Sequence, residues 1–306
     1  MNQGEIRHSV LVCTPKMTFL MLSGLLSIAY VNAAVTFESA HQVATVTNNL
    51  IREASGLCAS RAHADVLYTH NDSGDTNRIY AISATTGQLH GTIYIDGAQA
   101  KDWEDIACGP CHGGSGHCVY IGDVGGNTGG DANTIYMIRE PQSIKDQHVH
   151  VDDILQFSWD QHNCETLMVD PKGEVYVVSK VAPGHHGKFV HLPSSAWGSH
   201  HRVPVNEGVQ LTVTNQNEGP VGGDISPSGN EVLLKMYGEV LYWYIPDGNY
   251  YKHMVEHPQS LPYHHERQGE AVCWDVKASG YYTISEGANS PLWYYRRTSS
   301  IPAVGK

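Results

Sequence analysis

Five acidic residues recur along the chain, each at the start of a short apolar run. They are Glu53, Glu104, Glu165, Asp224 and Glu270. Carboxylates that converge on a narrow space must protonate, spread apart or bind a cation, because like charges repel at short range. Flexible sets of oxygen ligands suit calcium. We therefore predict that these acids bind Ca²⁺. The alternative is that each acid accepts backbone N–H bonds from the next structural unit and only locks the fold.

A second set of polar residues follows the next apolar run of each unit. A histidine beside acids can act as a general base near neutral pH, and a lysine can hold an anion or polarise a carbonyl. The predicted catalytic residues are His70, Asp72, Asp123 (with Asn127 nearby), Lys180, Lys235, Tyr237 and Glu286. The alternative for residues 70–75 is a turn whose Asn, Asp and Gly serve the backbone. Asn71 also begins a glycosylation sequon, and a glycan there would hinder a site on this face.

Short β-strands must position these residues. The five acids recur about every 50 residues, the period of a propeller blade. β-Branched and aromatic runs follow each acid, separated by Gly, Asn, Asp and Pro, and no convincing amphipathic helix is present. The second runs are 66–69, 119–121, 175–178, 232–234 and 281–284. The third runs are 79–82, 135–138, 189–192, 240–245 and 292–295. Fourth runs are visible in four units, at 92–95, 154–157, 209–213 and 251–255.

The fifth unit lacks a fourth strand, while residues 43–46 form a strand with no assigned partner. We predict that this N-terminal strand completes the last blade and closes the ring, which removes exposed sheet edges. The expected fold is an all-β, five-bladed β-propeller, with six blades if one long unit holds an extra hairpin. Because strands alternate in direction, the acids and the loops after the second strands should share one face at the channel mouth.

The N-terminal segment predicts export. Lys16 precedes an apolar stretch that ends in Ala33 and Ala34, the order of a secretory signal peptide, although Met17 is an alternative start. A membrane anchor is the other interpretation, but the run is short and interrupted by Ser and Gly. We predict a signal peptide at residues 1–34 and one propeller domain at residues 35–306. The mature protein should be extracellular, away from the membrane, and with a net charge of −12 it should not bind nucleic acid.

Six cysteines remain after the predicted leader, and an even number in an exported chain favours disulfides. The spacing of Cys108 and Cys111 could also indicate zinc or redox chemistry. No partner motif is present, and turn-forming residues surround the pair. A structural bridge within this loop, such as Cys118 with Cys108 or Cys111, is the favoured interpretation.

Four segments carry a family resemblance: Glu53-Ala-Ser-Gly-Leu57, His70-Asn-Asp-Ser-Gly74, Asp102-Trp-Glu-Asp105 and Gln268-Gly-Glu-Ala271. From about residue 50 to 296, the chain resembles secreted bacterial propellers of the broad phytase-like and lactonase-like group. The resemblance implies calcium in the channel and hydrolysis of phosphoesters, phosphotriesters or lactones at its mouth. This ring is wholly acidic, whereas lactonase-like sites mix Asn with acids and phytase-like sites have more Lys and Arg. Five-bladed propellers also include glycosidases.

The sequence therefore favours an extracellular, calcium-dependent hydrolase or lyase. Its substrate would be a carbohydrate or a small ester or lactone, bound at the acidic channel mouth. The alternative is a non-catalytic propeller that binds a glycan or a protein and holds a structural metal. Fold alone does not choose between these functions.

Overall fold

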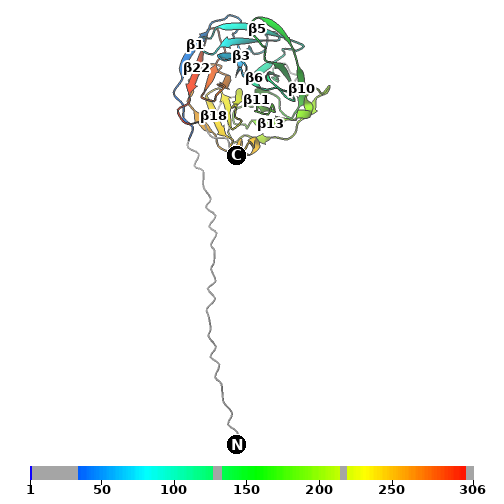
Figure 1. The fold of residues 1–306 in the computed structure, drawn as a ribbon, viewed down its shortest axis with the longest axis vertical. Helices are drawn as coiled ribbons and strands as arrows, with labels where there is room; N and C mark the ends of the chain where they lie inside the picture. The colour runs from blue at the N-terminus through cyan, green and yellow to red at the C-terminus, as the bar shows by residue number, and fades with distance from the viewer. Residues whose placement is uncertain (2–33, 127–132, 214–218, 301–306) are drawn as a thin grey trace. The chain divides into compact units, whose positions relative to one another are not determined.

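A computed structural model of the chain describes Met1 and residues 34–126, 133–213 and 219–300. Within these residues, the strands form five sheets arranged around a ring (Figure 1). The predicted five-bladed β-propeller is confirmed, and the described parts of the long units hold no sixth blade. The predicted signal peptide and its boundary fall almost wholly on residues 2–33, outside the described residues, and stay a prediction.

Each blade is built on an antiparallel meander. Blade 1 contains β2 (Ala54–Ala59), β3 (Val66–Asn71), β4 (Arg78–Ser83), β5 (Leu89–Asp96) and β9 (Gln147–His150). Blade 2 contains β6 (Trp103–Pro110), β7 (His117–Asp123), β8 (Thr134–Arg139), β10 (Asp153–Ser158) and β14 (Val203–Pro204). Blade 3 contains β11 (Cys164–Val169), β12 (Val175–Ser179), β13 (Lys188–Leu192) and β15 (Val209–Gln210). Blade 4 contains β16 (Gly222–Ile225), β17 (Glu231–Met236), β18 (Glu239–Tyr244) and β19 (Gln259–Leu261). Blade 5 contains β20 (Ala271–Trp274), β21 (Gly280–Ile284), β22 (Ser290–Arg296) and β1 (His41–Val46).

The ring closes as predicted. β1, the first strand of the chain, pairs antiparallel with β22, the last, and Figure 1 shows the two side by side. Blade 5 is thus assembled from both ends of the described chain. Closure of this kind leaves no long unpaired edge between the first and last blades.

One predicted strand is wrong. Residues 251–255 do not form the fourth strand of blade 4, because residues 250–253 form the helical turn α1 (Tyr250–His253). The Asn249 side chain accepts a hydrogen bond from Lys252 N, which is the usual N-cap interaction. The fourth strand is β19 instead, several residues later. A 3₁₀ turn, η1 (Ser194–Ala196), follows β13.

The hydrophobic core is divided into five layers, one between each pair of neighbouring blades. Alternation along β7 shows how one strand serves two layers. Cys118 and Tyr120 pack toward blade 3, while Val119 and Ile121 pack toward blade 1. Because both faces of each blade are covered, inner strands such as β2, β11 and β17 are buried along their whole length, while the outer strand β9 alternates between partly buried and exposed residues.

Two disulfides are present, as the even cysteine count predicted. Cys111 pairs with Cys118 inside the loop of blade 2, which was one of the two pairings proposed for that loop. Cys108 instead pairs with Cys58 and links the first strands of blades 1 and 2. Cys164 and Cys273 are buried and free. Two disulfides are compatible with an extracellular protein, but secretion itself stays a prediction.

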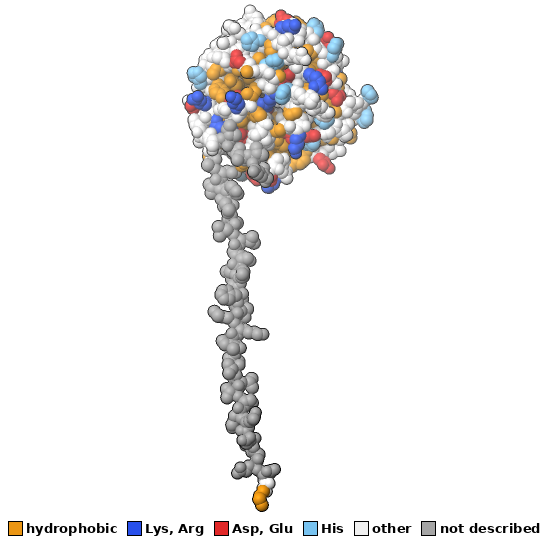
Figure 2. All heavy atoms as spheres, in the orientation of Figure 1, with side chains coloured by type: hydrophobic (Ala, Val, Ile, Leu, Met, Phe, Trp, Pro, Cys, Tyr) orange, Lys and Arg blue, Asp and Glu red, His pale blue; other side chains and the backbone are white. Residues whose placement is uncertain are grey.

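The surface mixes both signs of charge. On the face drawn in Figure 2, Lys and Arg side chains are interspersed with acidic, histidine and uncharged side chains. Among the described residues, no helix has the length and apolarity needed to span a bilayer.

Candidate active site at the channel mouth

Two bulges present acidic side chains at the mouth of the ring. The pairing of β6 with β7 shifts register between Trp103 and Asp105, which makes Glu104 the bulged residue. The pairing of β11 with β12 shifts in the same way around Glu165. A bulge adds a residue to one strand and re-aims its side chain. Glu104 and Glu165 therefore occupy equivalent positions in blades 2 and 3.

Three carboxylates meet beside the first bulge. One oxygen from each of Asp72, Asp102 and Glu104 lies within 4.8 Å of the others. Gly125 makes this approach possible, because a Cβ there would come within 2.1 Å of Glu104 Oε1 and 2.4 Å of Asp102 Oδ2. We call Asp72, Asp102 and Glu104 the acidic triad. The repeat pattern did not select Asp102, although it stands two residues before Glu104.

Asp123 holds the backbone of Asp102, one member of the acidic triad. It is buried, and its Oδ1 accepts a hydrogen bond of 2.8 Å from the backbone N–H of Asp102. Gly125 N donates to the Asp102 carbonyl as well. The predicted catalytic residue Asp123 therefore lies where it fixes the backbone of the triad. Asn127, named beside it, lies outside the described residues.

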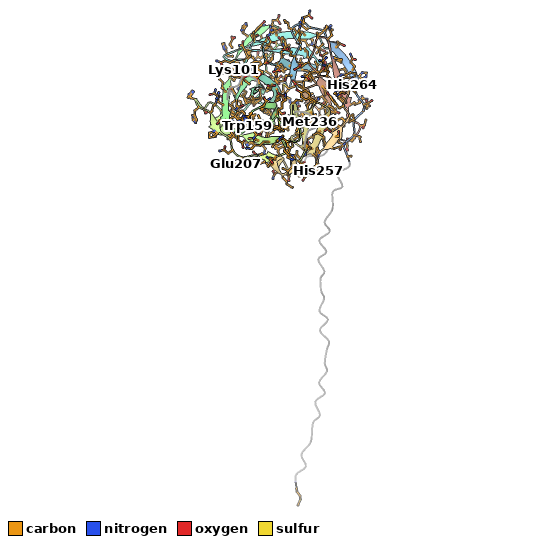
Figure 3. All side chains as sticks on the ribbon, turned by 180° about the vertical axis from the view of Figure 1, so that it is seen from behind. Lys101, Trp159, Glu207, Met236, His257 and His264 are labelled. Atoms are coloured by element: carbon orange, nitrogen blue, oxygen red, sulfur yellow. A yellow bond between two sulfur atoms is a disulfide. The ribbon has the colours of Figure 1, made fainter. Side chains whose placement is uncertain are left out.

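A chain of polar contacts crosses the mouth next to the triad. Lys180 Nζ lies 2.5 Å from Glu165 Oε1 and 3.4 Å from the Tyr237 hydroxyl, which donates to Glu270 Oε1 at 2.7 Å. Asn163 Nδ2 also donates to Glu165. These side chains come from blades 3, 4 and 5, so the mouth joins elements far apart in sequence. Met236, next to Tyr237, lies nearer the middle of the ring than Glu207 or His257 (Figure 3).

The mouth has two tiers of exposure. Glu104, Glu165 and Glu270 are buried. The partly exposed side chains above them are Asp72, Lys180, Tyr237 and Glu286. A ligand that approaches from solvent would meet the upper tier first.

Burial and mutual repulsion raise the pKa of the acids. The pKa of Glu104 is raised by burial and then by Glu165, Asp72, Asp102 and Glu270. Burial also raises the pKa of Asp72, Glu165 and Glu270, although Lys180 opposes the effect on each of them. Burial, followed by the charges of Glu270, Asp72 and Glu53, raises the pKa of Glu286 to about 7. The folded chain thus concentrates more negative charge at its mouth than it compensates.

Several buried carboxylate oxygens have no hydrogen-bond partner among the described residues, and two of them belong to acids of the mouth cluster. These two are Glu104 Oε1 and Glu165 Oε2. A buried, unpaired acceptor is costly, and each one in a native fold calls for an explanation. Hard carboxylate oxygens are the ligands that Ca²⁺ prefers. The acidic triad and the oxygens beside it fit a divalent cation in donor type, charge and proximity.

Asp224 does not join the mouth cluster. Its Oδ2 accepts from Trp274 N at 2.9 Å, which is a backbone bond to the next blade. The repeat alignment is one residue out of register here, because Asp224-Ile225 matches Asp105-Ile106 and not Glu104. The alternative interpretation of the acids, that they lock the ring through backbone N–H groups, describes Asp224.

Asp105 makes the same kind of lock and was missed by the sequence pattern. It is fully buried; Oδ2 accepts from Leu167 N at 2.9 Å and Gly223 N at 3.3 Å, and Oδ1 accepts from Ile106 N. One side chain therefore ties together the first strands of blades 2, 3 and 4. The shared Asp-Ile pair is the signal that could have found it.

Glu53 is exposed at the rim. Its backbone carbonyl accepts from Asp72 N, and its charge raises the pKa of Glu286. The bulge of β2 lies between Ala54 and Leu57, so Ser55 comes closer than Glu53 to the position of Glu104 in blade 2. The Ser55 hydroxyl donates to the Glu104 carbonyl at 2.5 Å.

His70 and Lys235 are buried away from solvent. His70 Nδ1 lies 2.8 Å from the Asn71 carbonyl, and the imidazole meets Trp103 edge-on. Burial lowers the pKa of His70 to about 4, so it is neutral at pH 7. Lys235 Nζ donates to the Met236 carbonyl and lies 4.0 Å from the centroid of the Tyr263 ring. Neither placement offers a group to a ligand at the mouth.

Comparison with known proteins finds matches among solved structures. No protein-family model matches the chain, and no curated protein matches it. A matching solved structure is the PQQ-bound form of an aldose sugar dehydrogenase from Streptomyces coelicolor. The identity is 10%, the match covers 85% of this chain and 98% of that chain, and the TM-score is 0.49. The assignment to the phytase-like and lactonase-like group stays a prediction.

Proposed function

We propose that this protein is an extracellular, calcium-dependent hydrolase that acts on a carbohydrate or a small ester or lactone at the mouth of its channel. One observation carries the proposal. The oxygens of the acidic triad converge within 4.8 Å, and one of them, Glu104 Oε1, is buried without a hydrogen-bond partner among the described residues. A cation would supply the missing partner and would neutralise the local charge.

The triad side chains would hold the cation, with Glu165 as the adjacent buried carboxylate. Bound Ca²⁺ would act as a Lewis acid toward a substrate oxygen. Asp123 and Gly125 would keep the triad in place, because the first anchors the Asp102 backbone and the second leaves room for the carboxylates. The chain thus provides both ligands and their support.

Glu286 and Tyr237 are the groups suited to proton transfer. Glu286 is partly exposed and has a pKa of about 7, so its carboxylate can accept a proton from an attacking water near neutral pH. Burial raises the pKa of Tyr237, which therefore keeps its hydroxyl proton. To donate to the leaving oxygen, that hydroxyl would turn its one hydrogen away from Glu270, while Lys180 would still hold the phenol oxygen in place.

An activity screen tests this proposal. Chromogenic aryl glycosides, aryl esters and lactones would be offered with calcium and again with a chelator. We expect calcium-dependent turnover of one class, lowered at least about 100-fold in Glu286→Gln and in Glu104→Gln. Glu174→Gln is the matched control, because Glu174 pairs with His191 outside the mouth. Turnover that survives both mouth substitutions would overturn the proposal.

One observation favours a second candidate. Lys180 contacts Glu165 and Tyr237, and Tyr237 donates to Glu270, so these four side chains are linked without any ligand, as in a structural cluster. A non-catalytic propeller with a structural cation would have this arrangement. For that function, calcium would raise the melting temperature of the parent while no substrate class is turned over.

A further inference from the structure

A second pocket lies on the face of the ring opposite the mouth. β12 ends beside Lys180 at the mouth, so Tyr176, near its start, lies at the far end of blade 3. The chain returns along β13 and places His191 beside Tyr176. In blade 4, β18 leaves the mouth after Tyr237 and leads to Asp247 on the same far face. We call this cavity the rear pocket.

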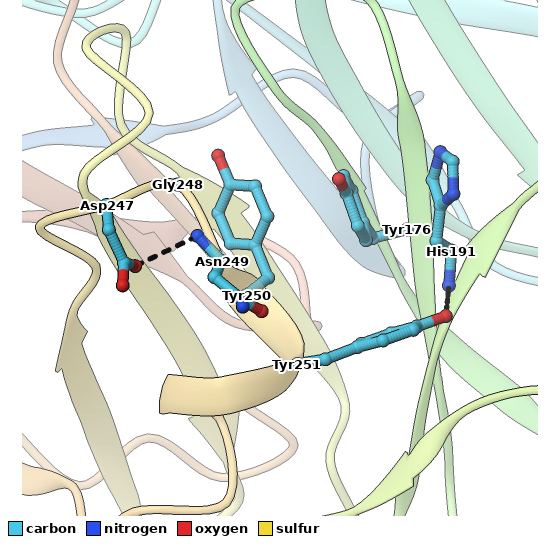
Figure 4. Close-up of a pocket in the computed structure, with 7 residues that line it drawn as sticks. All are labelled: Tyr176, His191, Asp247, Gly248, Asn249, Tyr250 and Tyr251. Atoms are coloured by element: carbon cyan, nitrogen blue, oxygen red, sulfur yellow. Dashed lines mark hydrogen bonds between the residues drawn. The ribbon is translucent and has the colours of Figure 1, made fainter.

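The rear pocket has a volume of about 330 Å³. Its lining residues are Tyr176, His191, Asp247, Gly248, Asn249, Tyr250 and Tyr251. Figure 4 shows the three tyrosines and His191 grouped on one side, with Asp247 and Asn249 on the other. An aromatic wall opposite a few fixed polar groups is a common plan for a small-ligand site. Among the described residues, no aliphatic side chain lines this pocket.

The aromatic side is continuous. The ring centroids of Tyr176 and Tyr250 are 4.8 Å apart, and those of Tyr176 and His191 are 4.9 Å apart. The Tyr250 hydroxyl donates to the Gly229 carbonyl, and the Tyr251 hydroxyl accepts from His191 N. Tyr176 and Tyr250 are themselves buried in the core between blades 3 and 4, so Tyr251 is the tyrosine that stays partly exposed to the pocket. Rings packed at these separations form a wall rather than the separated sides of a cage for a cation.

Asp247 provides the polar side. Oδ1 accepts from Asn249 N and lies 2.8 Å from His253 Nε2, while Oδ2 lies 2.9 Å from Lys252 Nζ. The carboxylate is therefore held in one orientation, and its charge is already met by a lysine. It remains 44% exposed, so it can accept further hydrogen bonds from hydroxyl groups. A neutral, polyhydroxylated ligand suits it better than a second cation.

We propose that the rear pocket binds the terminal sugar of a glycan. The C–H face of the sugar ring lies against the partly exposed ring of Tyr251, which Tyr176 and Tyr250 back from the core, and neighbouring hydroxyls donate to Asp247. This site goes beyond the proposed hydrolase and does not depend on it, because it lies at the opposite ends of blades 3 and 4 and uses no residue of the mouth. It would let the protein hold a glycan-bearing surface whatever reaction occurs at the channel.

Saturation-transfer NMR on the full chain tests the proposal, with the methyl glycosides of glucose, galactose, mannose and N-acetylglucosamine as probes. We expect at least one to bind with a Kd near ~1 mM, the affinity of a single small contact site. Asp247→Asn and Tyr251→Leu should each weaken that binding about tenfold or more, with unchanged circular dichroism. Asp247 is exposed, so its variant should fold even if Tyr251→Leu does not.

Two controls locate the binding. Tyr94→Leu removes a tyrosine that also stacks on a histidine, His148, but lies outside the rear pocket, and it should leave the affinity unchanged. Glu104→Gln should leave it unchanged too. The proposal is overturned if no glycoside binds, if Glu104→Gln abolishes the binding, or if tetramethylammonium binds in place of the sugars.

Discussion

Among single residues, Lys180 is the cation that offsets part of the negative charge at the mouth. It pairs with Glu165 at 2.5 Å and lowers the pKa of Asp72 and Glu270 as well. Its own pKa is raised, because the attraction of Glu165 and its neighbours outweighs burial, which lowers it. A bound cation must therefore share the carboxylates with a permanent positive charge.

Lys180→Met should consequently tighten calcium binding. Removal of one positive charge several ångströms from the site is expected to raise the affinity about tenfold, because charges at this range interact by one to a few kcal/mol. Titration calorimetry measures the change. Lys188→Met is the control, since Lys188 pairs with the exposed Asp160. Equal or weaker calcium binding by Lys180→Met would contradict this assignment of the triad.

Asn71 illustrates a residue whose motif is misleading. It stands in a glycosylation sequon, yet it is buried. Its Oδ1 accepts from Arg52 N and Glu53 N, and its Nδ2 donates to the Leu50 carbonyl and to Asp75. An amide with these bonds has no free nitrogen for a glycan.

We expect no glycan on Asn71 when the chain is exported by a eukaryotic cell, as intact-mass spectrometry would show. Asn71→Ala should lower the free energy of unfolding by about 2–4 kcal/mol, because it leaves buried backbone groups unpaired. Asn206→Ala, at an exposed position, should change it by less than about 0.5 kcal/mol. A glycopeptide containing Asn71 would refute this account of the residue.

At the scale of elements, the sequence pattern located strands well and their register less well. β-Branched and aromatic runs mark β3, β7, β12, β17 and β21, because each strand is covered by blades on both sides. A bulge adds one residue without changing that pattern. The alignment therefore paired Asp224 with Glu104, although Asp224 matches Asp105. The acidic triad was only partly predictable, because it joins a strand bulge to a turn of another blade.

Asp105 should be one of the main links between blades. Asp105→Ala leaves three buried N–H groups without their acceptor and should cost about 3–5 kcal/mol in urea unfolding. Asp105→Asn keeps an oxygen and should cost clearly less. Asp153→Ala is the matched control, because the partly exposed Asp153 accepts from its own neighbour, Ile154 N, and from no other donor in the described parts of the chain. If Asp105→Ala has the same free energy of unfolding as the parent, Asp105 does not stabilise the contacts between blades.

At the scale of the whole molecule, closure of the ring forces the acids together. β1 and β22 complete blade 5, five core layers hold the blades in place, and the first strands then converge around one channel. Such packing can compensate for the strain of buried, unpaired carboxylates at a functional site. Burial and the mutual repulsion of these converging carboxylates raise the pKa of several mouth acids.

Stability without calcium should therefore depend on pH. Glu286 has an ordinary pKa of 4.5 when unfolded and about 7 when folded, so between these values the folded chain binds more protons. The free energy of unfolding then falls as pH rises from about 5 to 7. Melting temperatures in chelator should follow this slope, and Glu286→Gln should reduce it, leaving the part due to Glu165 and Asp224, whose pKa burial also raises to about 7. The assignment would be contradicted if the melting temperature of the parent in chelator rose with pH over this range. It would also be contradicted if Glu286→Gln kept the full slope of the parent.

The central claim is that the acidic triad binds a divalent cation. The most direct measurement is the calcium dependence of the melting temperature of the mature protein, with metal content measured in parallel, for the parent and for Glu104→Gln. We predict that calcium co-purifies with the parent and raises its melting temperature by several degrees. At a free calcium concentration of 100 times Kd, binding should add about 2.7 kcal/mol to the free energy of unfolding. Both effects should vanish in the variant. A parent that binds no calcium, or a variant that responds as the parent does, would show that the acids at the mouth are not a cation site.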